Sequence, residues 1–537
     1  MMDSLYTAKS GLSVARSAVD VTSNNIANEN TEAYKKRTVD VSEISSLEDN
    51  IGNGVSFDGV TRTTNEYLYT QLTQQNSLME YYNQEDLTSS NIETMFSETD
   101  SSGLSITISD FFNDLESLRS DPNSSIYQEQ LESQSETLVN NLSSLYEELD
   151  EIETSTYSLL EDQVSSVNSI LEEIVYLNEK IVKNSSSSNN DLLDKRDALE
   201  EELSKYVDFK IDTSSSKYNL EIAGVSAIFN NTNLHEVSIN ETYTAQKDIY
   251  SSTSLEDSNI NSSDEITLTL NNTTSITITA NPDLTSDDYD FKNQIVDEIN
   301  NNSEFNELSA YLDTSNNLII TSTKEGEESK FDLAITINDV EIQKNDNSIQ
   351  GKDEVFLSIY NEELSLESGS IKSLTNNLST STSIISSYKS SLDDFANALV
   401  SEFNKNSSTS VFTGSSISTL SFVQNSIGSL SSDDLESLAQ IQWSDEINID
   451  SNSDDTTSFS QFYQNLLVSV SSHVESNNFR LDSQKSIVNS LESTYNELTK
   501  VDTDEEMVNL LQYQAAYEAN AKIITAVDEM LQTLLNM

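Results

Sequence analysis

The side chains that most often carry acid–base or metal chemistry are scarce in this sequence. His235 and His473 are its two histidines, and neither lies in an HExxH pattern or beside a serine arranged as a nucleophile. Cysteine is absent, which excludes a disulfide framework and a thiolate metal site. Because catalysis requires such groups at defined spacings, we predict that the protein is not an enzyme and has no catalytic residues.

Two other patterns could bind ligands. Gly52, Gly54 and Gly59 form neither a GxGxxG nor a Walker motif, so we interpret them as part of a β-turn rather than a phosphate cradle. The acidic residues 502–506 (DTDEE) lack the spacing and the central glycine of an EF-hand loop. Such residues are typical of a helix start, where carboxylates interact favourably with the helix dipole. We therefore predict no cofactor and no metal site.

Lys35, Lys36 and Arg37 form the densest basic cluster of an acidic chain. One interpretation is a solubilising start of a strand. The other is a cluster that meets acidic neighbours across a contact between subunits. Under the second interpretation, charge reversal alters the rate of assembly more than the folding of the monomer.

Both ends of the chain carry the pattern of coiled-coil helices, with mostly apolar side chains at alternating intervals of three and four residues. The N-terminal positions are Leu5, Ala8, Leu12, Ala15, Val19, Thr22 and Ile26. The C-terminal positions are Leu510, Tyr513, Tyr517, Asn520, Ile524, Val527, Leu531 and Leu534. An ordinary amphipathic helix packed on its own domain gives the same pattern. A matching pair at two termini, which are usually frayed and polar, favours helices that bind neighbours.

We therefore predict an assembly interface between copies of the chain. Isolated helices are marginal in water, and a pair of helices leaves apolar surface on its outer side. Burying that surface against neighbours contributes roughly 25 cal/mol per Å², so folding of the ends is coupled to assembly. The predicted interface residues are Leu5, Leu12, Ala15, Val19, Ile26, Tyr513, Tyr517, Ile524, Val527, Leu531 and Leu534.

The rest of the sequence predicts a mainly α fold with a β insertion. Heptad-like runs over residues 138–181, broken near Ser155, and over residues 467–498 favour an elongated helical-bundle stalk built from both halves of the chain. Short alternating segments in the middle, such as residues 266–270 (ITLTL), 276–279 (ITIT) and 318–321 (LIIT), indicate strands. Polar residues 271–275 suit a hairpin connection, and Phe291, Ile295 and Ile299 indicate one helix.

Three domains are predicted from these runs. A terminal coiled-coil domain combines residues 1–35 with 502–537, and a helical stalk domain combines residues 36–204 with 375–501. An inserted, mostly-β outer domain takes residues 205–374.

The formal charge of −65, from 92 acidic and 27 basic residues, opposes binding to phosphate backbones and anionic lipids. We therefore expect no nucleic-acid partner and no membrane insertion. A run of about 18 apolar residues is missing, and the first residues resemble no cleaved signal peptide. If the protein acts outside the cell, we expect export by a route that reads an uncleaved N-terminus.

Residues 23–28 (SNNIAN), 30–31 (NT) and 33–35 (AYK) resemble the N-terminal signature of flagellar rod, hook and hook-associated proteins, which usually has Gly at the position of Ala33. Residues 512–524 (QYQAAYEANAKII) are similar to the C-terminal helix of the same family.

Internal matches favour the hook-filament junction proteins, which are hook-associated proteins of the FlgK type. Segments after the first helix, at residues 52–55 (GNGV), 60–62 (VTR) and 67–72 (YLYTQL), resemble theirs. Residues 190–197 (NDLLDKRD), continuing to Tyr206 and Val207, resemble a distinctive junction-protein motif. Residues 388–403 followed by 411–414 (VFTG) are similar to the return of the chain into the helical domain.

This resemblance implies a secreted structural protein of the bacterial flagellum that joins hook to filament and serves flagellum assembly and cell motility. The implied partners are other copies of the chain, the hook protein and the second hook-associated protein. A cytoplasmic export chaperone is expected to cover the C-terminal helix, with the Tyr513 to Leu534 positions as its target. The implied location is extracellular, at the hook-filament junction. Alternatives are a hook or distal rod subunit, an acidic extracellular adhesin, or a hydrolase on the flagellum.

Overall fold

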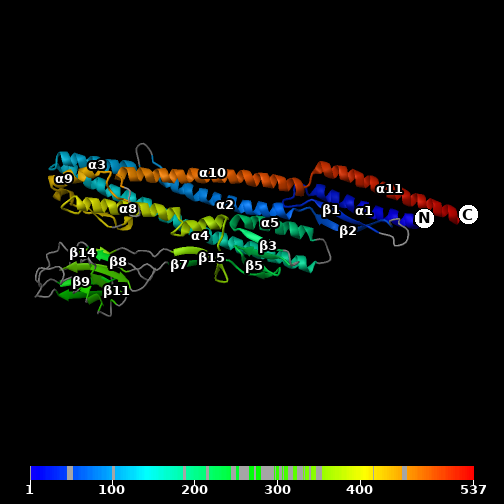
Figure 1. Ribbon diagram of the computed structural model, residues 1–537, viewed down its shortest axis with the longest axis horizontal. Coiled ribbons are helices and arrows are strands. Elements are labelled where there is room, and N and C mark those ends of the chain that lie inside the picture. The colour runs from blue at the N-terminus through cyan, green and yellow to red at the C-terminus, as the bar shows by residue number, and fades with distance from the viewer. Residues whose placement is uncertain are drawn as a thin grey trace.

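The computed structural model is an elongated molecule in which long helices run side by side and both termini lie at the same end (Figure 1). The structure describes residues 2–44, 53–98, 103–184, 189–212, 217–243, 249–252, 265–270, 274–279, 295–296, 298–300, 305, 308–312, 318–322, 331, 333–337, 340–345, 353–414, 416–449 and 456–536.

Helices dominate the described part of the chain. They are α1 (Met2–Ala27), α2 (Glu66–Met95), α3 (Leu104–Ser120), α4 (Ser125–Lys183), α5 (Asn190–Tyr206), α7 (Ser370–Leu378), α8 (Ile384–Lys405), α9 (Ser432–Ile441), α10 (Phe459–Thr499) and α11 (Thr503–Leu535). Short 3-10 turns are η4 (Ile417–Thr419) and η5 (Ile427–Ser429). None of the described helices is long and apolar enough to cross a membrane.

Strands are concentrated between α5 and α7. A first hairpin is formed by β1 (Arg37–Glu43) and β2 (Val55–Arg62), and a small late one by β17 (Phe412–Thr413) and β18 (Ser421–Phe422). The strands between α5 and α7 are β3 (Phe209–Asp212), β4 (Asn219–Ile222), β5 (Val225–Phe229), β6 (Asn233–Leu234), β7 (Ser238–Tyr243), β8 (Ile249–Ser252), β9 (Glu265–Leu270), β10 (Thr274–Thr279), β11 (Leu308–Leu312), β12 (Leu318–Ser322), β13 (Leu333–Ile337), β14 (Val340–Asn345), β15 (Asp353–Ile359) and β16 (Glu362–Glu363). The predicted fold class, mainly α with a β insertion, is confirmed.

The stalk is built from both halves of the chain, as predicted. Helix α10 packs along α2, while α4 packs against α3, α5, α7 and α8 (Figure 1). One hydrophobic core joins side chains of α3, α4, α8, α9 and α10, including the fully buried Phe111, Phe403 and Phe459. Polar interruptions of the α10 seam bind α2, since Asn477 Nδ2 donates to the carbonyl of Tyr82 (3.0 Å) and Gln484 Nε2 to that of Gln75 (2.9 Å).

The predicted break in the helix near Ser155 is wrong, because α4 continues through it for 59 residues. The Ser155 and Thr156 hydroxyls both donate to the carbonyl of Ile152, at 2.9 and 2.7 Å. These bonds satisfy the hydroxyls within the helix, so the polar stretch does not compete with helical backbone bonding. Leu149 and Leu160 are fully buried on either side and hold the helix against its neighbours.

Most predicted β features lie where expected. Strands β9 and β10 pair antiparallel, as do β11 and β12, while residues 271–273 of the predicted connection lie outside the described residues. Ile295 and Ile299 are buried in helical turns, and Phe291 is also outside the described residues. Gly52, which lies in the sequence between β1 and β2, is outside them too.

The β segment contributes to two different environments. Side chains of β4, β5 and β15 share a core with α4, α5 and α7, with Leu220, Ile228 and Leu357 among the buried residues. The strands β8 to β14 form two further sheets, of order β10-β9-β13-β14 and β11-β12-β8, which lie beside the stalk (Figure 1). The predicted three-domain division therefore stays a prediction, and the shared core places part of residues 205–374 against the stalk.

Candidate assembly interface and the charged joint behind it

Helices α1 and α11 pack along each other at the end of the molecule that carries both termini (Figure 1). Asp502 caps α11, because its carboxylate accepts hydrogen bonds from the backbone N–H of Asp504 (2.9 Å) and of Glu505 (3.1 Å). Asp504, Glu505 and Glu506 occupy the first turn. The interpretation of residues 502–506 as an acidic helix start is thereby confirmed.

The predicted interface residues lie mainly between α1 and α11 of one chain. Ala15 and Val527 are buried there. Half-buried are Leu5, Leu12, Val19, Ile26, Ile524 and Leu531. Tyr513, Tyr517 and Leu534 stay exposed, with 37%, 40% and 54% of their surfaces accessible. The structure brings the two predicted seams together within a single chain, and their burial by neighbouring copies remains a prediction.

A close contact within this helix pair was not predicted from the sequence. A Cβ at Gly11 would meet the side chain of Asn520 at 3.0 Å, so Gly11 leaves room for the amide on α11. Asn520 is one of the polar positions of the C-terminal heptad pattern. An amide seated over a glycine fixes how far the two helices slide along each other.

Behind the helix pair lies a network that we call the charged joint, made by Asn25, Tyr34, Lys35, Lys36, Arg37, Arg62, Tyr69, Asp191, Asp194, Arg196, Asp197, Glu200, Tyr218, Glu505 and Glu506. Most of these residues come from the motifs at residues 23–37, 60–72 and 190–206.

Asn25 is at the centre of the joint and is fully buried. Its Nδ2 donates to Glu506 Oε2 and to the carbonyl of Arg37, both at 2.9 Å. Its Oδ1 accepts from the Tyr34 hydroxyl at 2.9 Å and from the N–H of Arg37 at 3.1 Å. One amide therefore joins α1, the turn after it, β1 and α11. Asn25 belongs to the SNNIAN signature, and the resemblance of that signature was the feature of the sequence that could have identified Asn25.

Lys36 and Arg37 find acidic partners in the same chain, and a contact of the cluster across subunits stays a prediction. Lys36 Nζ lies 2.7 Å from Glu505 Oε2, and burial, which disfavours its charge, is outweighed by the carboxylates, which raise its pKa. Arg37 forms ion pairs with Asp191 and Asp194. The physical reason is that folding brings α5 and the start of α11 against β1, which begins at Arg37 as the strand-start interpretation expects.

Lys35 differs from its two neighbours because it is buried. Its ammonium group lies 4.5 Å from the centre of the Tyr495 ring, a cation–π contact. Burial lowers the pKa of Lys35, although the carboxylates of Asp197, Glu201 and Asp194 act in the opposite direction.

Arg62 connects the β1–β2 hairpin to α5. Its guanidinium lies 2.6 Å from Asp197 Oδ2 and 3.2 Å from Asp194 Oδ1, and all three side chains are largely buried. Burial raises the pKa of Asp197, and the adjacent Arg62 partly offsets that effect. The hairpin thus carries two arginines, Arg37 and Arg62, that share Asp194.

Glu200 is the buried end of the joint. Its carboxylate accepts hydrogen bonds from the Tyr218 hydroxyl (2.8 Å) and the Tyr69 hydroxyl (3.0 Å). Arg196 Nε lies 3.2 Å away as an ion pair without hydrogen-bond geometry. Burial raises the pKa of Glu200 to about 7. Glu200, Tyr69 and Tyr218 were not identified from the sequence, because their meeting depends on the packing of α2, α5 and the segment before β4.

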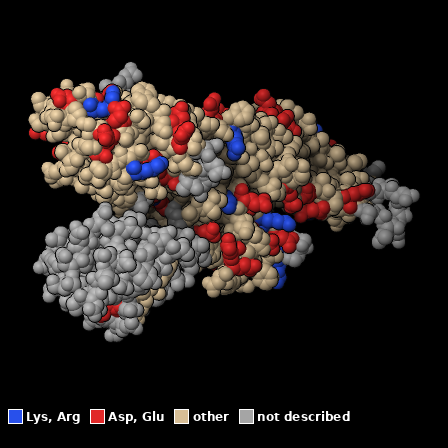
Figure 2. Space-filling view, turned by 60° about the vertical axis from the view of Figure 1, so that its left-hand side comes forward, with Lys and Arg blue, Asp and Glu red and all other residues tan. Residues whose placement is uncertain are grey.

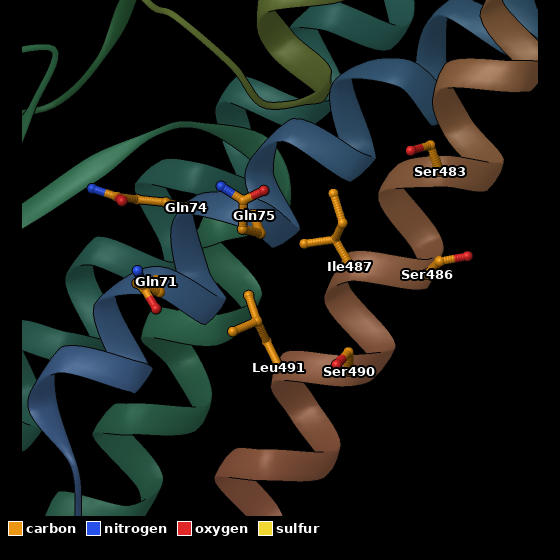
Figure 3. Close-up of a pocket in the computed structure, with 8 residues that line it drawn as sticks. All are labelled: Gln71, Gln74, Gln75, Ser483, Ser486, Ile487, Ser490 and Leu491. Atoms are coloured by element: carbon orange, nitrogen blue, oxygen red, sulfur yellow. The ribbon is translucent and has the colours of Figure 1, made fainter.

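A groove of about 600 Å³ lies between α2 and α10 (Figure 3). Its lining residues are Gln71, Gln74, Gln75, Ser483, Ser486, Ile487, Ser490 and Leu491. Figure 3 shows Ile487 and Leu491 pointing from α10 toward α2. None of these lining side chains is an acid, a base or a thiol. Within the part of the chain that the structure describes, no three His, Cys, Asp or Glu side chains gather to hold a metal ion.

Three family models match separate parts of the sequence. The helical domain of the flagellar hook-associated protein FlgK matches residues 89–273. The flagella basal body rod protein family matches residues 5–35, and the C-terminal family of the flagellar basal body rod FlgEFG proteins matches residues 492–537. The two rod-type matches cover most of α1 and all of α11.

Relatives of known identity agree with the family models. Flagellar hook-associated protein 1 of Bacillus subtilis (strain 168) is 26% identical over 227 residues, which cover 40% of this chain and 45% of the relative. The protein of that name from Escherichia coli (strain K12) is 29% identical over 235 residues, covering 42% of each chain. The chain thus matches less than half the length of these relatives.

A solved structure, the flagellar hook junction protein FlgK from Burkholderia pseudomallei, is 14% identical, with a TM-score of 0.37 over 63% of this chain and 43% of the other. The family models and the relatives match by sequence, and these matches do not depend on this partial structural similarity. The family model of the helical domain and these relatives support a flagellar hook-associated protein of the FlgK type.

Proposed function

We propose that this protein is a structural subunit of the bacterial flagellum that joins the hook to the filament and has no catalytic activity. One observation carries the proposal: a helical domain of the hook-associated type lies between two terminal helices of the rod type, and those helices pair at one end of the molecule. A subunit with such an end can enter a shared axial structure while its stalk and β insert project from it.

The assembly step follows from the surface of the terminal pair. Packing α1 on α11 buries one stripe of each helix and leaves large apolar side chains in water, among them Tyr6, Leu511, Ile523 and Met530. Covering these side chains with neighbouring copies stabilises the assembly by roughly 25 cal/mol per Å² removed from water. A monomer lacking neighbours then has marginally stable ends, which suits export of an unfolded chain.

The partners and location follow from this role. We propose contacts with other copies of the chain, with the hook protein and with the second hook-associated protein, outside the cell at the hook-filament junction. Before export through an uncleaved N-terminal signal, a cytoplasmic chaperone covers α11 at the Tyr513 to Leu534 positions.

Deleting the gene tests the proposed role. Loss of a junction subunit leaves hooks without filaments, and filament protein accumulates in the medium. Cells that instead lose their hooks would contradict the proposal and favour a hook or rod subunit. Leu12→Asp and Leu531→Asp are expected to block incorporation, and Thr137→Asp, at an exposed position of α4 in the stalk, is the control.

A hook or distal rod subunit is the second candidate, because both end segments match rod-type families. The flagellar basal-body rod protein FlgG of Buchnera aphidicola is 50% identical over 44 residues, which supports a rod-type segment in this chain. Immunogold labelling of isolated flagella separates the candidates by the position of the label at rod, hook or junction. An acidic adhesin predicts label along the cell surface.

A further inference from the structure

The stalk contains two hydrophobic cores that follow each other along α4. One core holds Leu145 and Leu149 of α4 together with side chains of α3, α8, α9 and α10. The other holds Leu160 and Val164 together with side chains of α5, α7, β4 and β5. We call them the distal and the proximal core, because the second lies nearer to the end that carries both termini (Figure 1). Between Leu149 and Leu160, α4 rises by about 17 Å.

Polar contacts fill the level between the two cores. Glu85 on α2 accepts hydrogen bonds from Ser373 (2.8 Å) and Asn377 (3.1 Å) on α7. The buried Lys389 on α8 pairs with Asp150 and Glu153 on α4. We call this level the polar belt, and its members are Gln84, Glu85, Thr88, Asp150, Glu153, Thr156, Ser373, Asn377, Ser383, Tyr388, Lys389 and His473.

The backbone crosses the polar belt in long helices and in one short turn. Helices α2, α4 and α10 continue through it (Figure 1), and the turn at residues 379–383 joins α7 to α8. Leu378 at the end of α7 belongs to the proximal core, whereas Ile385 at the start of α8 belongs to the distal core. Among the described residues, the two halves of the stalk are therefore connected by backbone and polar contacts, and each half has its own core.

Helix α4 has its one polar seam position at the belt. From Leu138 to Ile174, the buried side chains of α4 are apolar except for Thr156. The hydroxyls of Ser155 and Thr156 both donate to the carbonyl of Ile152. Bonds of this kind leave a helix continuous and let it bend. Helix α4 is therefore easiest to bend at the level where the two cores are separated.

Water has access to the belt. The side chains of Asp150 and Glu153 are 55% and 27% accessible. The Tyr388 hydroxyl lies 2.7 Å from Nδ1 of His473, which is exposed. A polar contact that is open to water loses little free energy when it breaks, because water replaces the partner. Separating an apolar core exposes its surface to water without such a replacement. The belt is thus the level at which the stalk deforms at the lowest cost.

We propose that the stalk bends at the polar belt, with the distal and proximal cores moving as two rigid bodies about residues 150–158 of α4 and the turn at residues 379–383. Polar contacts of the belt exchange partners with water during this motion, and both cores stay packed. The far half of the stalk can then change its angle while the end with both termini is held in place. The inference concerns a single chain and does not depend on the proposed function.

Amide hydrogen exchange of the purified full-length protein tests the belt. The amides at residues 152–158 of α4 are expected to exchange at least tenfold faster than those at residues 140–148 and 164–172, which lie along the two cores. Equal protection over the three segments would overturn the inference.

Thr156→Leu is expected to remove most of this difference, because leucine continues the apolar seam through the belt. Thr154→Leu is the matched control, since Thr154 is exposed on the same helix and leucine there raises the helix propensity without entering the seam. Thr156→Val removes the hydroxyl and keeps the size of the side chain, so it should act in the same direction without overpacking. Equal slowing by the control, or no slowing by either change at Thr156, would contradict the role of the seam.

Distances between pairs of spin labels test the bending itself, and a chain without cysteine allows labels at chosen sites. Asn397→Cys with Ser169→Cys spans the belt, whereas Asn397→Cys with Thr137→Cys lies within the distal half, and all three positions are exposed. The distance distribution of the first pair should be at least twice as wide as that of the second, and Thr156→Leu should narrow it. Equal widths would overturn the proposal even if the belt exchanges quickly, since the belt would then open without bending the stalk.

Discussion

At the residue scale, the turn after α1 depends on a backbone conformation that alanine adopts poorly. Ala33 has a φ of 61°, in the left-handed region where the Cβ of a non-glycine residue meets the following carbonyl. Glycine adopts this region without that cost. The turn is preserved because Tyr34 and Arg37 are held on Asn25 by hydrogen bonds.

Ala33→Gly is expected to stabilise the turn and the hairpin after it by about 1 kcal/mol, since it removes the steric cost and adds a smaller entropy cost. Amide hydrogen exchange of β1 and β2 measures this as slower local opening. Ala516→Gly, at a helical and exposed position of α11, should have the opposite sign, at about 1 kcal/mol. Faster exchange in the Ala33→Gly protein would show that the left-handed conformation of Ala33 does not lower the stability of the turn.

Glu200 makes the joint sensitive to pH. Its pKa in the folded protein, about 7, is above the ordinary 4.5, so the folded state holds a proton that the unfolded chain releases. The contribution of Glu200 to stability therefore falls as the pH rises from about 4.5 to about 7. Glu200→Gln, which does not ionise and keeps one of the two oxygens that accept from Tyr69 and Tyr218, removes this dependence.

The stability of Glu200→Gln relative to the natural protein should therefore increase between pH 5 and pH 8, by about 1 to 3 kcal/mol. Urea unfolding of the stalk at several pH values provides the measurement. Glu172→Gln, at an exposed position of α4, is the control and should show no such trend. A difference that stays constant across this pH range would mean that Glu200 is already ionised at pH 5.

At the element scale, the β1–β2 hairpin connects the terminal helices to the stalk through Arg37 and Arg62. Removing one partner of a buried ion pair leaves charges without compensation, which costs more than the pair contributes. Arg62→Ala leaves the buried Asp197 without this ion-pair partner and Asp194 with Arg37 alone.

Arg62→Ala is therefore expected to destabilise the hairpin and α5 by about 3 kcal/mol, measured as faster amide exchange in both elements. Arg119→Ala also removes two ion pairs, with Glu116 and Glu436, but on the surface of the stalk. Water replaces those interactions, so the exchange rates around Arg119 should barely change. Equal effects of the two substitutions would argue that the joint is solvated.

Helices with one apolar stripe were predictable, and helices without one were not. The α1, α10 and α11 patterns stood out because a single face is buried in each. Helix α2 was not indicated, because its buried residues include Thr73, Asn76, Ser77 and Gln84. These side chains are paired across elements, as where Asn76 donates to Ser204 (2.9 Å) and Ser77 pairs with Ser368 (2.8 Å). A polar core leaves no hydrophobic period for a sequence to display.

At the scale of the whole molecule, the charge of −65 opposes the approach of copies. Acidic side chains are spread over much of the visible face of the helical part, with fewer basic ones between them (Figure 2). Salt shortens the range of this repulsion from about 30 Å at 0.01 M to about 8 Å at 0.15 M.

Polymerisation of the purified protein should therefore accelerate as sodium chloride is raised over that interval, followed by light scattering. A neutral osmolyte at equal osmolality controls for excluded-solute effects. A rate that stays unchanged with salt would show that the assembling surfaces are already shielded from the acidic remainder of the chain.

The sequence alone determined the helical ends, the stalk drawn from both halves and the strands between them, because each follows from the local period of apolar side chains. Tertiary structure decided which groups meet. Asn25 binds Glu506 across 481 positions of sequence, and Lys36 and Arg37 find carboxylates in their own chain. Local patterns fix which face of an element is apolar, whereas the partner of that face depends on contacts between distant segments. For the same reason, only the folded molecule shows that the predicted seams meet each other inside one chain.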